Sequence, residues 1–533
     1  MSAGVRPRWP VPPNWAWATL SQLGEIVGGG TPSTKEPAYW GDEITWISPA
    51  DLTGYSNKTI GKGRKGLSKL GLNNSSAKVM PAGSVHFSSR APVGHVVISS
   101  KPTATNQGFK SLVPASGLVN SYIYYYLIAS REYARSRANG TTFLELSGKA
   151  FGELAIPVAP TGEQHRIVSM IDRLFSELDA GIESLQKARA QLATYRQSVL
   201  KNAFDGRLTA QWGEMSRDRL EAPTQLLDRI KRARTERYEC QLTEWRMAVD
   251  EWTESPRSDK RPTRPAPPKA VPPLLRTETE RLPTLPAGWS YLRLGLLIDE
   301  PKYGTSKKCG HNFSGTGVLR IPNVVDGVIN TEDLKGARFD SADVQAFSLM
   351  QGDVLMIRSN GSISIVGKSA IVSEEEEEYL YAGYLMRLRT NPDVITPEYL
   401  NLVLGSQFIR VQIEEKAKST SGVNNINARE VQSLVVPLCS VDEQRMIVKQ
   451  LSQVLAIIDA LDGNIKDRML VTEGLRQAIL ARAFRGQLVP QDPSIVPASF
   501  VLDKISADRA RTAKSTTRRP VGKRRAAKSL QYD

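Results

Sequence analysis

Two long stretches of the chain carry apolar residues at intervals of three and four, the spacing of one face of an α-helix. The first begins near Thr161, where Gln164 completes a capping box, and the second begins near Ser440. Each pattern continues for about forty residues, or roughly 60 Å, so each helix needs a partner along its length. The apolar positions are Ile167, Ile171, Leu174, Leu178, Ile182, Leu185, Leu192 and Val199, then Ile447, Leu451, Val454, Ile458, Leu461, Ile465, Leu475 and Ile479.

These two apolar faces allow two packing arrangements. In one, each helix packs on its own neighbouring domain, as most amphipathic helices do. In the other, the two faces meet in one antiparallel pair around a pseudo-twofold axis. Because the two stretches match each other in register, we predict the antiparallel pair.

The match extends beyond the helices and indicates an internal repeat. Residues 195–211 return as residues 475–491 with eight identities among seventeen positions. The segment EQHRIV from Glu163 returns as EQRMIV from Glu443, and PxxWxxxxL occurs at both Pro12 and Pro286. Two copies are too few for a stacked solenoid, so the repeat predicts pseudo-twofold symmetry.

Each long helix follows a region of mixed signals, in which strands are expected at Val96 and Ser369 and helices at SYIYYYLIAS and PEYLNLVLGS. The predicted fold class is α+β, with two tandem globules and two long helices. Between the halves, an amphipathic helix precedes nine prolines that lie between Pro256 and Pro286. The expected segments are residues 1–160 (globule), 161–211 (helix), 212–284 (helix and proline-rich linker), 285–439 (globule), 440–491 (helix) and 492–533 (disordered basic tail).

The chain has 533 residues and a formal net charge of +15, which makes a polyanionic partner plausible. The excess is concentrated at one end, because residues 504–533 hold ten Lys and Arg against two Asp. No apolar run approaches the length of a membrane span, and the first residues lack the apolar stretch of a secretory signal. We therefore expect a cytoplasmic protein without membrane partners, in which three distant cysteines are reduced thiols.

No motif of the sequence predicts catalysis. GSISIVGKS, from Gly361, has five residues between its glycines where a phosphate-binding loop needs four. The four histidines show no metalloprotease spacing, and no nucleophile elbow or cluster of metal-type carboxylates stands out. By exclusion, we predict a binding protein that is not an enzyme and holds no metal or cofactor of its own.

Polar residues at turns of each globule are the candidates for that binding. Arg with Ser or Asn suits guanine and adenine edges in a major groove, and Lys suits phosphate. The alternative is that Ser, Asn and Gly populate any surface turn. The candidates are Ser88, Ser89, Arg90, His95, Asn106, Gln107, Lys110, Thr141 and Thr142 in the first globule, and Arg358, Ser359, Asn360, Lys368, Ser419, Asn424, Asn425 and Asn427 in the second.

With these motifs in order, the chain resembles the specificity subunits of type I restriction-modification systems. The resemblance rests on the tandem halves, the two PxxWxxxxL openings, EQHRIV and EQRMIV, and the endings AFDGRL from Ala203 and AFRGQL from Ala483. It implies that the globules are target recognition domains, each reading half of an asymmetric, bipartite site in double-stranded DNA. The helices would then act as a spacer, with half-sites about one turn, roughly 34 Å, apart.

The resemblance also implies partners that perform the chemistry. Two methyltransferase subunits with S-adenosylmethionine would methylate a flipped adenine, and restriction subunits with an ATP- and Mg-dependent motor and nuclease would join them. The proline-rich insertion and the basic tail depart from the compact family pattern. Two alternatives remain: a fused enzyme that transfers methyl groups itself, and a helical adaptor that binds proteins without DNA sequence preference.

Overall fold

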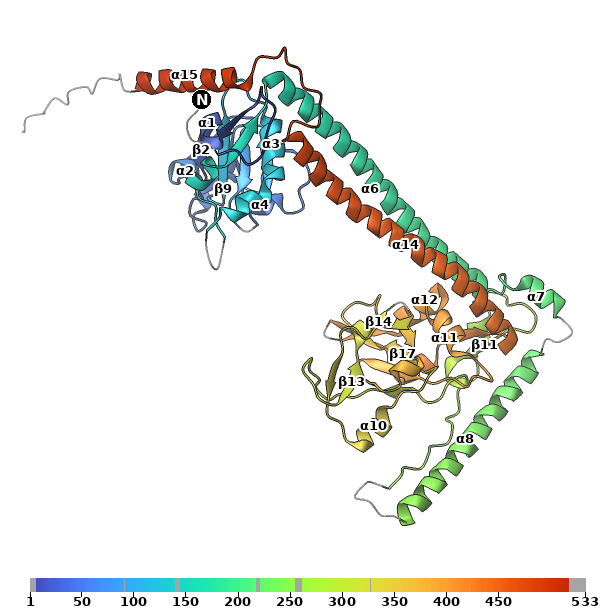
Figure 1. Cartoon of the computed structure of the whole chain (residues 1–533). Helices are drawn as coiled ribbons and strands as arrows, with labels where there is room; N and C mark the ends of the chain where they lie inside the picture. Colours follow the sequence, from blue (N-terminus) through green and yellow to red (C-terminus); the bar gives the residue numbers. More distant parts are fainter. Residues whose placement is uncertain are drawn as a thin grey trace, which may run out of the picture. The chain divides into compact units, whose positions relative to one another are not determined.

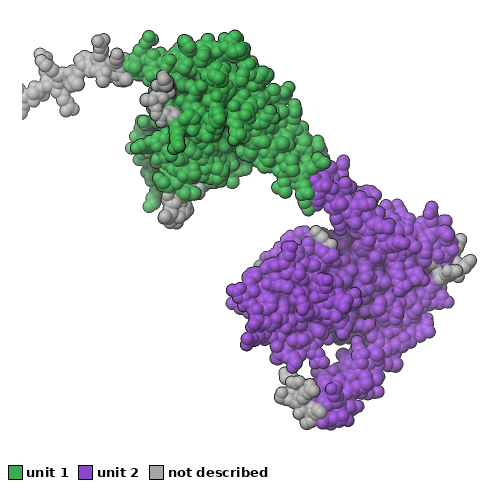
Figure 2. All heavy atoms as spheres, in the orientation of Figure 1, with its two compact units in different colours: residues 1–186, 466–533 green, residues 187–465 purple. Residues whose placement is uncertain are grey.

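The computed structural model describes residues 6–90, 92–139, 144–216, 221–254, 261–325, 327–420 and 422–516. The chain divides into two compact units (Figure 2). Unit 1 comprises residues 1–186 and 466–533, and unit 2 comprises residues 187–465. Each unit therefore holds a mixed globule, the start of one long helix and the end of the other.

Unit 1 is built on a five-stranded sheet in the order β2 (Gly24–Gly28), β9 (Phe109–Pro114), β6 (Val85–Ser88), β7 (Val96–Ser99) and β4 (Thr59–Ile60). A three-stranded sheet has the order β5 (Gly66–Leu67), β3 (Trp40–Ile47) and β8 (Thr103–Thr105). Helix α3 (Asn120–Ala129) packs on β6 and β7 (Figure 1). It is apolar nearly all round, as a helix enclosed in a core must be. The shorter helices are α1 (Leu20–Leu23), α2 (Lys69–Asn73), α4 (Arg131–Ser136) and α5 (Gly148–Gly152).

Unit 2 contains a four-stranded sheet in the order β12 (Lys302–Tyr303), β21 (Leu385–Leu388), β17 (Val354–Ile357) and β19 (Ser369–Ile371). Further strands pair as β16 (Lys335–Ala337), β13 (Thr316–Leu319) and β20 (Leu380–Tyr381), and as β14 (Val324–Val325) with β15 (Val328–Ile329). Its helices include α10 (Ser341–Phe347), α11 (Pro397–Leu404), α12 (Gln407–Lys416) and α13 (Ala428–Gln432). Thr396 caps α11, and Pro397 occupies the first turn, where its missing N–H costs nothing.

A short strand pair closes each globule where its long helix begins. In unit 1, β1 (Ala16–Thr19) pairs antiparallel with β10 (Ala155–Val158), three residues before helix α6 (Thr161–Phe204). In unit 2, β11 (Ser290–Arg293) pairs in the same way with β24 (Val435–Leu438), ahead of α14 (Val441–Ala483). The expected strands at Val96 and Ser369 and the two expected helices before the long ones are therefore confirmed.

The two long helices run antiparallel within each unit. In unit 2, Arg189 Nε lies 2.7 Å from Asp462 Oδ1, and Arg196 Nη1 lies 2.5 Å from Asp459 Oδ1. In unit 1, Arg476 pairs with Asp179. As the position on α6 increases, its partner on α14 decreases, which is the signature of an antiparallel pair.

The first turns of the helices also pack on their own globules, so both expected arrangements contribute. Ile167 and Ile171 belong to the core of unit 1, and Ile447 and Leu451 belong to the core of unit 2. The expected antiparallel pair forms, but it buries the two apolar faces only in part, because Leu461 and Leu475 are 45% and 46% exposed. Two helices alone bury only a narrow strip, and apolar residues at its edge stay in contact with water.

The end of each long helix packs on the globule of the other half. Phe484, just beyond α14, lies 5.1 Å in ring-centroid distance from both Tyr122 and Tyr126 of α3. Phe204, the last residue of α6, lies 5.5 Å from Tyr399 of α11. All of these rings are buried, and their edge-to-face geometry is one that aromatic pairs prefer.

A buried glutamate at the start of each helix joins three segments. Glu163 accepts hydrogen bonds from Trp15 Nε1 at 3.0 Å and from Gln491 Nε2 at 2.5 Å. Glu443 accepts from Trp289 Nε1 at 3.0 Å and from Thr209 Oγ1 at 2.7 Å. Burial raises the pKa of Glu443 above its ordinary value. In each unit, one carboxylate thus connects the opening segment of the globule, its own helix and the segment after the other helix.

Two expected boundaries differ from the structure, because the long helices end before residues 211 and 491, and α14 ends at Ala483. Helix α6 ends at Phe204, and Gly206 then adopts φ 72° against Pro286, a left-handed conformation that ends a helix and that glycine tolerates. Between the halves, α7 (Ala210–Met215) and α8 (Pro223–Glu254) precede the proline-rich segment and α9 (Arg276–Thr279).

No helix among the described residues is long and apolar enough to cross a membrane.

The expectation that residues 492–533 form a disordered tail is wrong for its first part, since α15 (Ala498–Thr516) packs on unit 1. Ala498 and Ile505 are buried, and Arg509 donates to the carbonyls of Ser21 and Gly24. The apolar side chains recur at helical spacing beneath the basic ones, so the high charge did not prevent packing. Residues 517–533 lie outside the described residues.

Strand β6 carries a buried histidine, and its titration makes the stability of unit 1 depend on pH. His86 Nδ1 lies 2.9 Å from Ser111 Oγ on β9, and burial lowers the pKa of His86 to about 4. In the unfolded chain this pKa is about 6.5. Between pH 6.5 and pH 4, His86 is therefore protonated in the unfolded state and neutral in the folded state. The stabilising effect is therefore complete above pH 6.5 and is lost as the pH falls towards 4.

We expect unit 1 to lose about 2 kcal/mol more stability between pH 7 and pH 5 than a His86→Gln variant does. Hydrogen exchange of peptides covering β6 and β9, corrected for intrinsic rates, measures the difference. The variant is the matched control, because every other titrating group is common to both chains. Equal losses in the two proteins would show that His86 does not drive the pH dependence.

Candidate nucleic-acid interface

In unit 1, the two candidate serines at the end of β6 hold a loop in place. Ser88 Oγ donates to Pro92 O at 2.7 Å and accepts from the backbone N–H of His95 at 2.8 Å. Ser89 Oγ donates to Gly108 O at 3.0 Å. Both side chains are fully buried, so they shape the loop rather than reach a ligand.

Next to this loop, Arg90 and Lys110 converge on one carboxylate. Arg90 Nη2 lies 2.9 Å from Glu145 Oε2, and Lys110 Nζ lies 3.6 Å from Glu145 Oε1. The hydrogen bond from Arg90 holds the pKa of Glu145 below its ordinary value. The Arg90 side chain is half exposed, whereas the Lys110 side chain is mostly buried. The arrangement presents a guanidinium that is oriented and still accessible to a base or phosphate.

The other described unit 1 candidates lie just before β7 and β9, next to the end of β6. Asn106 Oδ1 accepts from the N–H of Gly108 at 2.5 Å, while Gln107 is exposed and accepts from Thr31. Burial, followed by the positive charges of Arg131 and Arg135, lowers the pKa of His95. Neutral His95 would thus offer one donor and one acceptor. Thr141 and Thr142 lie outside the described residues.

In unit 2, Arg358 follows β17 and is held by an aromatic ring and a carbonyl. Its guanidinium carbon lies 4.4 Å from the ring centroid of Tyr303, and Nη1 donates to Gly383 O at 3.0 Å. The Nε of Arg358 is buried and has no hydrogen-bond partner among the described residues. A buried donor without a partner costs free energy, which a ligand or water acceptor would recover.

Beside Arg358, a small sheet gathers five of the candidates. Its strand order is β18 (Ser359–Asn360), β23 (Val423–Asn425) and β22 (Lys418–Thr420). Ser359 pairs with Asn425, and Asn360 pairs with Asn424, so residues more than 60 positions apart become neighbours. Asn425 Oδ1 is buried without a partner within the described residues.

Two other unit 2 candidates, Asn427 and Lys368, lie outside this sheet. Asn427 caps α13 by accepting from the N–H groups of Arg429 and Glu430, which is a structural role. Lys368 is exposed after the turn at Gly367. Ser419 is on β22, but its side chain is outside what the structure describes.

The backbone hydrogen bonds show which positions of the two loops correspond. Leu146 N donates to Ser89 O in unit 1, and Ile426 N donates to Arg358 O in unit 2. The position of Arg358 therefore corresponds to that of Ser89, and Arg90 corresponds to Ser359. The unit 2 loop has four additional residues before Gly367, so the two arginines occupy different positions in loops of different length.

Three residues of these surfaces are not among the candidates predicted from the sequence: Glu145, Tyr303 and Tyr384. Glu145 lies 280 positions before Asn425, so the repeat offset alone could have indicated it. Tyr303 and Tyr384 are 41% and 63% exposed, and only the pairing of β12 with β21 and the turn before β21 bring them near Arg358. No local pattern signals either tyrosine.

Comparison with known proteins gives a consistent family. The family described as "Type I restriction modification DNA specificity domain" matches residues 12–187. The EcoKI specificity subunit of Escherichia coli K12 is 24% identical over 410 residues, which are 75% of this chain and 74% of that protein. The MjaIX specificity subunit of Methanocaldococcus jannaschii is 35% identical over 196 residues, which are 36% of this chain and only 44% of that protein.

A solved structure supports the fold independently. A chain from a study of complex assembly and conformational transition of the type I R-M system aligns with a TM-score of 0.61 at 18% identity. The alignment covers 90% of this chain and 100% of that chain. The arrangement of mixed globules and long helices is therefore shared over most of the length.

Proposed function

The chain belongs to the family of type I restriction-modification specificity subunits, and from this premise we propose that each of its units reads one half of an asymmetric, bipartite DNA site. The chain would recognise the DNA sequence, and its partner subunits would catalyse the reactions. Residues 1–160 and 285–439 would be the two target recognition domains.

The observation that carries the proposal is that corresponding loops present different chemistry. In unit 1, the strand-to-loop position offers Arg90, oriented by Glu145. In unit 2, the corresponding loop offers Arg358, one position earlier, on Tyr303 and next to Asn425. The Nε of Arg358 and the Oδ1 of Asn425 have no hydrogen-bond partner among the described residues. Arg suits guanine and Asn suits adenine in the major groove, whereas a paired Arg–Glu surface suits a different set of base edges. Different surfaces on one scaffold imply different half-sites.

We further propose that the chain arose as one unit built twice. Matched contacts support this: Trp15 with Glu163 and Trp289 with Glu443, at corresponding positions of the sequence. Tyr122 and Tyr399 likewise donate to Pro157 O and Pro437 O in the closing strands. Such a repeat would give two methyltransferase subunits equivalent docking sites.

Exposed apolar side chains on α14 are the candidate contacts for those partners. Ile457 is 62% exposed in unit 2, and Leu470 is 73% exposed in unit 1. Large apolar groups left in water favour a protein partner. Two methyltransferase subunits with S-adenosylmethionine would modify adenines, and ATP-dependent restriction subunits would join them. Under this proposal the chain performs no catalysis itself.

The deciding experiment is selection from random duplex DNA by the chain co-purified with its methyltransferase subunit. We expect a split motif with two unlike halves and a gap of fixed length. Binding without sequence preference would reject the proposal and favour a protein-binding adaptor. Methylation of DNA by the chain alone would instead revive the fused-enzyme alternative.

The same selection assigns the arginines to half-sites. Arg358→Ala should reduce discrimination at one half-site by about 1 to 3 kcal/mol, because a bidentate contact with a base is lost. Arg90→Ala is the matched control and should leave that half-site unchanged while altering the other. If Arg358→Ala weakens binding equally on all sequences, Arg358 contacts phosphate and not a base.

The helices offer a test of how the gap is specified. Four residues inserted at matching points of α6 and α14 keep the antiparallel pairing and add about 6 Å, the rise of roughly two base pairs. We expect an altered gap with both half-sites retained. Four residues inserted in the linker between α8 and α9 form the control and should leave the gap unchanged. An unaltered gap in the helix variant would refute a spacer role for the helices.

A further inference from the structure

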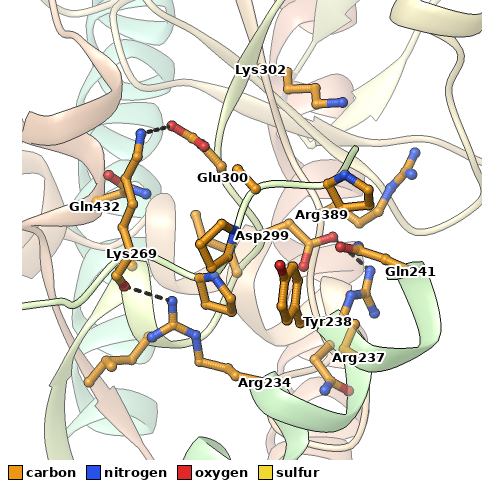
Figure 3. A pocket seen from close by; sticks show the side chains of 18 of the residues that line it. Arg234, Arg237, Tyr238, Gln241, Lys269, Asp299, Glu300, Lys302, Arg389 and Gln432 are labelled. Atoms are coloured by element: carbon orange, nitrogen blue, oxygen red, sulfur yellow. Dashed lines mark hydrogen bonds and ion pairs between the residues drawn. The ribbon is translucent and has the colours of Figure 1, made fainter. Parts of the chain in front are cut away.

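A basic groove in unit 2 lies outside the candidate DNA-reading loops. It has a volume of about 500 Å³, within the range of small-molecule sites. Its walls are α8, the proline-rich segment at residues 263–269, the loop before β12 and the end of β21 (Figure 3). One of these walls, the proline-rich segment, belongs to the insertion that departs from the compact family pattern.

Hydrogen bonds and one ion pair hold the walls of the groove together. On α8, Trp245 Nε1 donates to Pro262 O at 3.0 Å, and Arg234 Nη2 donates to Lys269 O at 3.2 Å. Arg237 Nη2 joins α8 to the loop before β12 through Asp299 Oδ2 at 2.8 Å. Leu226 and Ile230 anchor α8 itself in the core of unit 2. The groove is therefore a built feature of unit 2.

The lining carries much more positive than negative charge. Its cations are Arg234, Arg237, Arg264, Lys269, Lys302, Arg387 and Arg389, and its anions are Asp299 and Glu300. Carboxylates neutralise three of the cations: Asp299 pairs with Arg237, Glu300 with Lys269, and Asp353 with Arg389 at 2.6 Å. For Arg234, Arg264, Lys302 and Arg387, the described residues provide no carboxylate partner.

Four like charges held at one groove destabilise each other. Burial, and then the charges of Arg387 and Arg389, lower the pKa of Lys302, and burial lowers the pKa of Arg387. An anion bound among them would remove this repulsion and would be held by charge-assisted hydrogen bonds. A nucleoside triphosphate carries roughly four negative charges near neutral pH, which matches the unpaired cations.

The groove also offers groups suited to a base. Figure 3 shows Tyr238 and Arg234 on the α8 side, opposite Lys302 and Arg389. The Tyr238 ring provides a face for stacking. The side-chain amides of Gln241, Asn391 and Gln432 can donate to and accept from the edge of a base.

We propose that this groove binds a nucleoside di- or triphosphate, with Arg234, Arg264, Lys302 and Arg387 on the phosphates and Tyr238 against the base. The proposal is independent of which DNA sequence the chain reads. Duplex DNA is the other polyanion available, but a groove bounded by α8 on one side and by the proline-rich segment on another suits a compact ligand better than a duplex.

Calorimetric titration of the full chain, with its methyltransferase subunit where that is needed for solubility, tests the proposal using ATP, ADP and inorganic triphosphate as probes. We expect ATP to bind with a dissociation constant in the micromolar range and more tightly than triphosphate. Arg264→Ala and Lys302→Ala should each weaken ATP about tenfold or more. Neither residue belongs to the hydrophobic core of unit 2, so neither variant should unfold the protein.

Two controls separate the contributions. Arg246→Ala removes the same charge from an exposed position of α8 outside the groove and should leave ATP binding unchanged. Tyr238→Ala should weaken ATP and spare triphosphate. No ATP binding by the unaltered chain would overturn the proposal. So would variants that reduce the affinity for duplex DNA but not that for ATP, because the groove would then be a contact for the DNA backbone.

Discussion

The structure depends on one buried carboxylate at the start of each long helix. Glu163 and Glu443 each accept a tryptophan N–H from the opening of a globule and a second hydrogen bond from the segment that follows the other helix. A buried carboxylate without donors would destabilise the fold strongly, so all three segments must be present together. This requirement is why each unit is assembled from parts of the chain hundreds of positions apart.

The hydrogen bonds of Glu163 and Glu443 also position the surfaces that we propose to read DNA. The closing strand pair of each globule lies directly before the helix that carries the glutamate, so the globule is fixed to the helix on which partners would dock. Arg90 and Arg358 project from loops at the far ends of strands packed on α3 or α11. The two globules share this framework of strands and helices, and they differ in a few residues of the loops. A specificity protein can in this way change its target without altering its framework.

The sequence predicted the candidate site unevenly, for a physical reason. Arg358, Asn424 and Asn425 are candidates because polar residue types at turns are visible in sequence, and the structure brings these three together. Ser88 and Ser89 are polar residues at a turn as well, yet their hydroxyls form hydrogen bonds with nearby backbone carbonyl and N–H groups. Tyr303 gave no signal, since its place beside Arg358 follows from pairing between β12 and β21. Which polar group is free is decided by neighbours that are distant in sequence.

Taken alone, the sequence determined the periodicity of the two helices, the repeat of their flanking motifs, the class of fold and the family. These features depend on local spacing, which the chain carries in every conformation. Only the tertiary structure decided where α6 ends, that α15 packs on unit 1, that Leu461 and Leu475 remain exposed, and that Arg358 corresponds to Ser89. Each of these depends on which surfaces meet, and burial and hydrogen bonding between distant segments set that outcome.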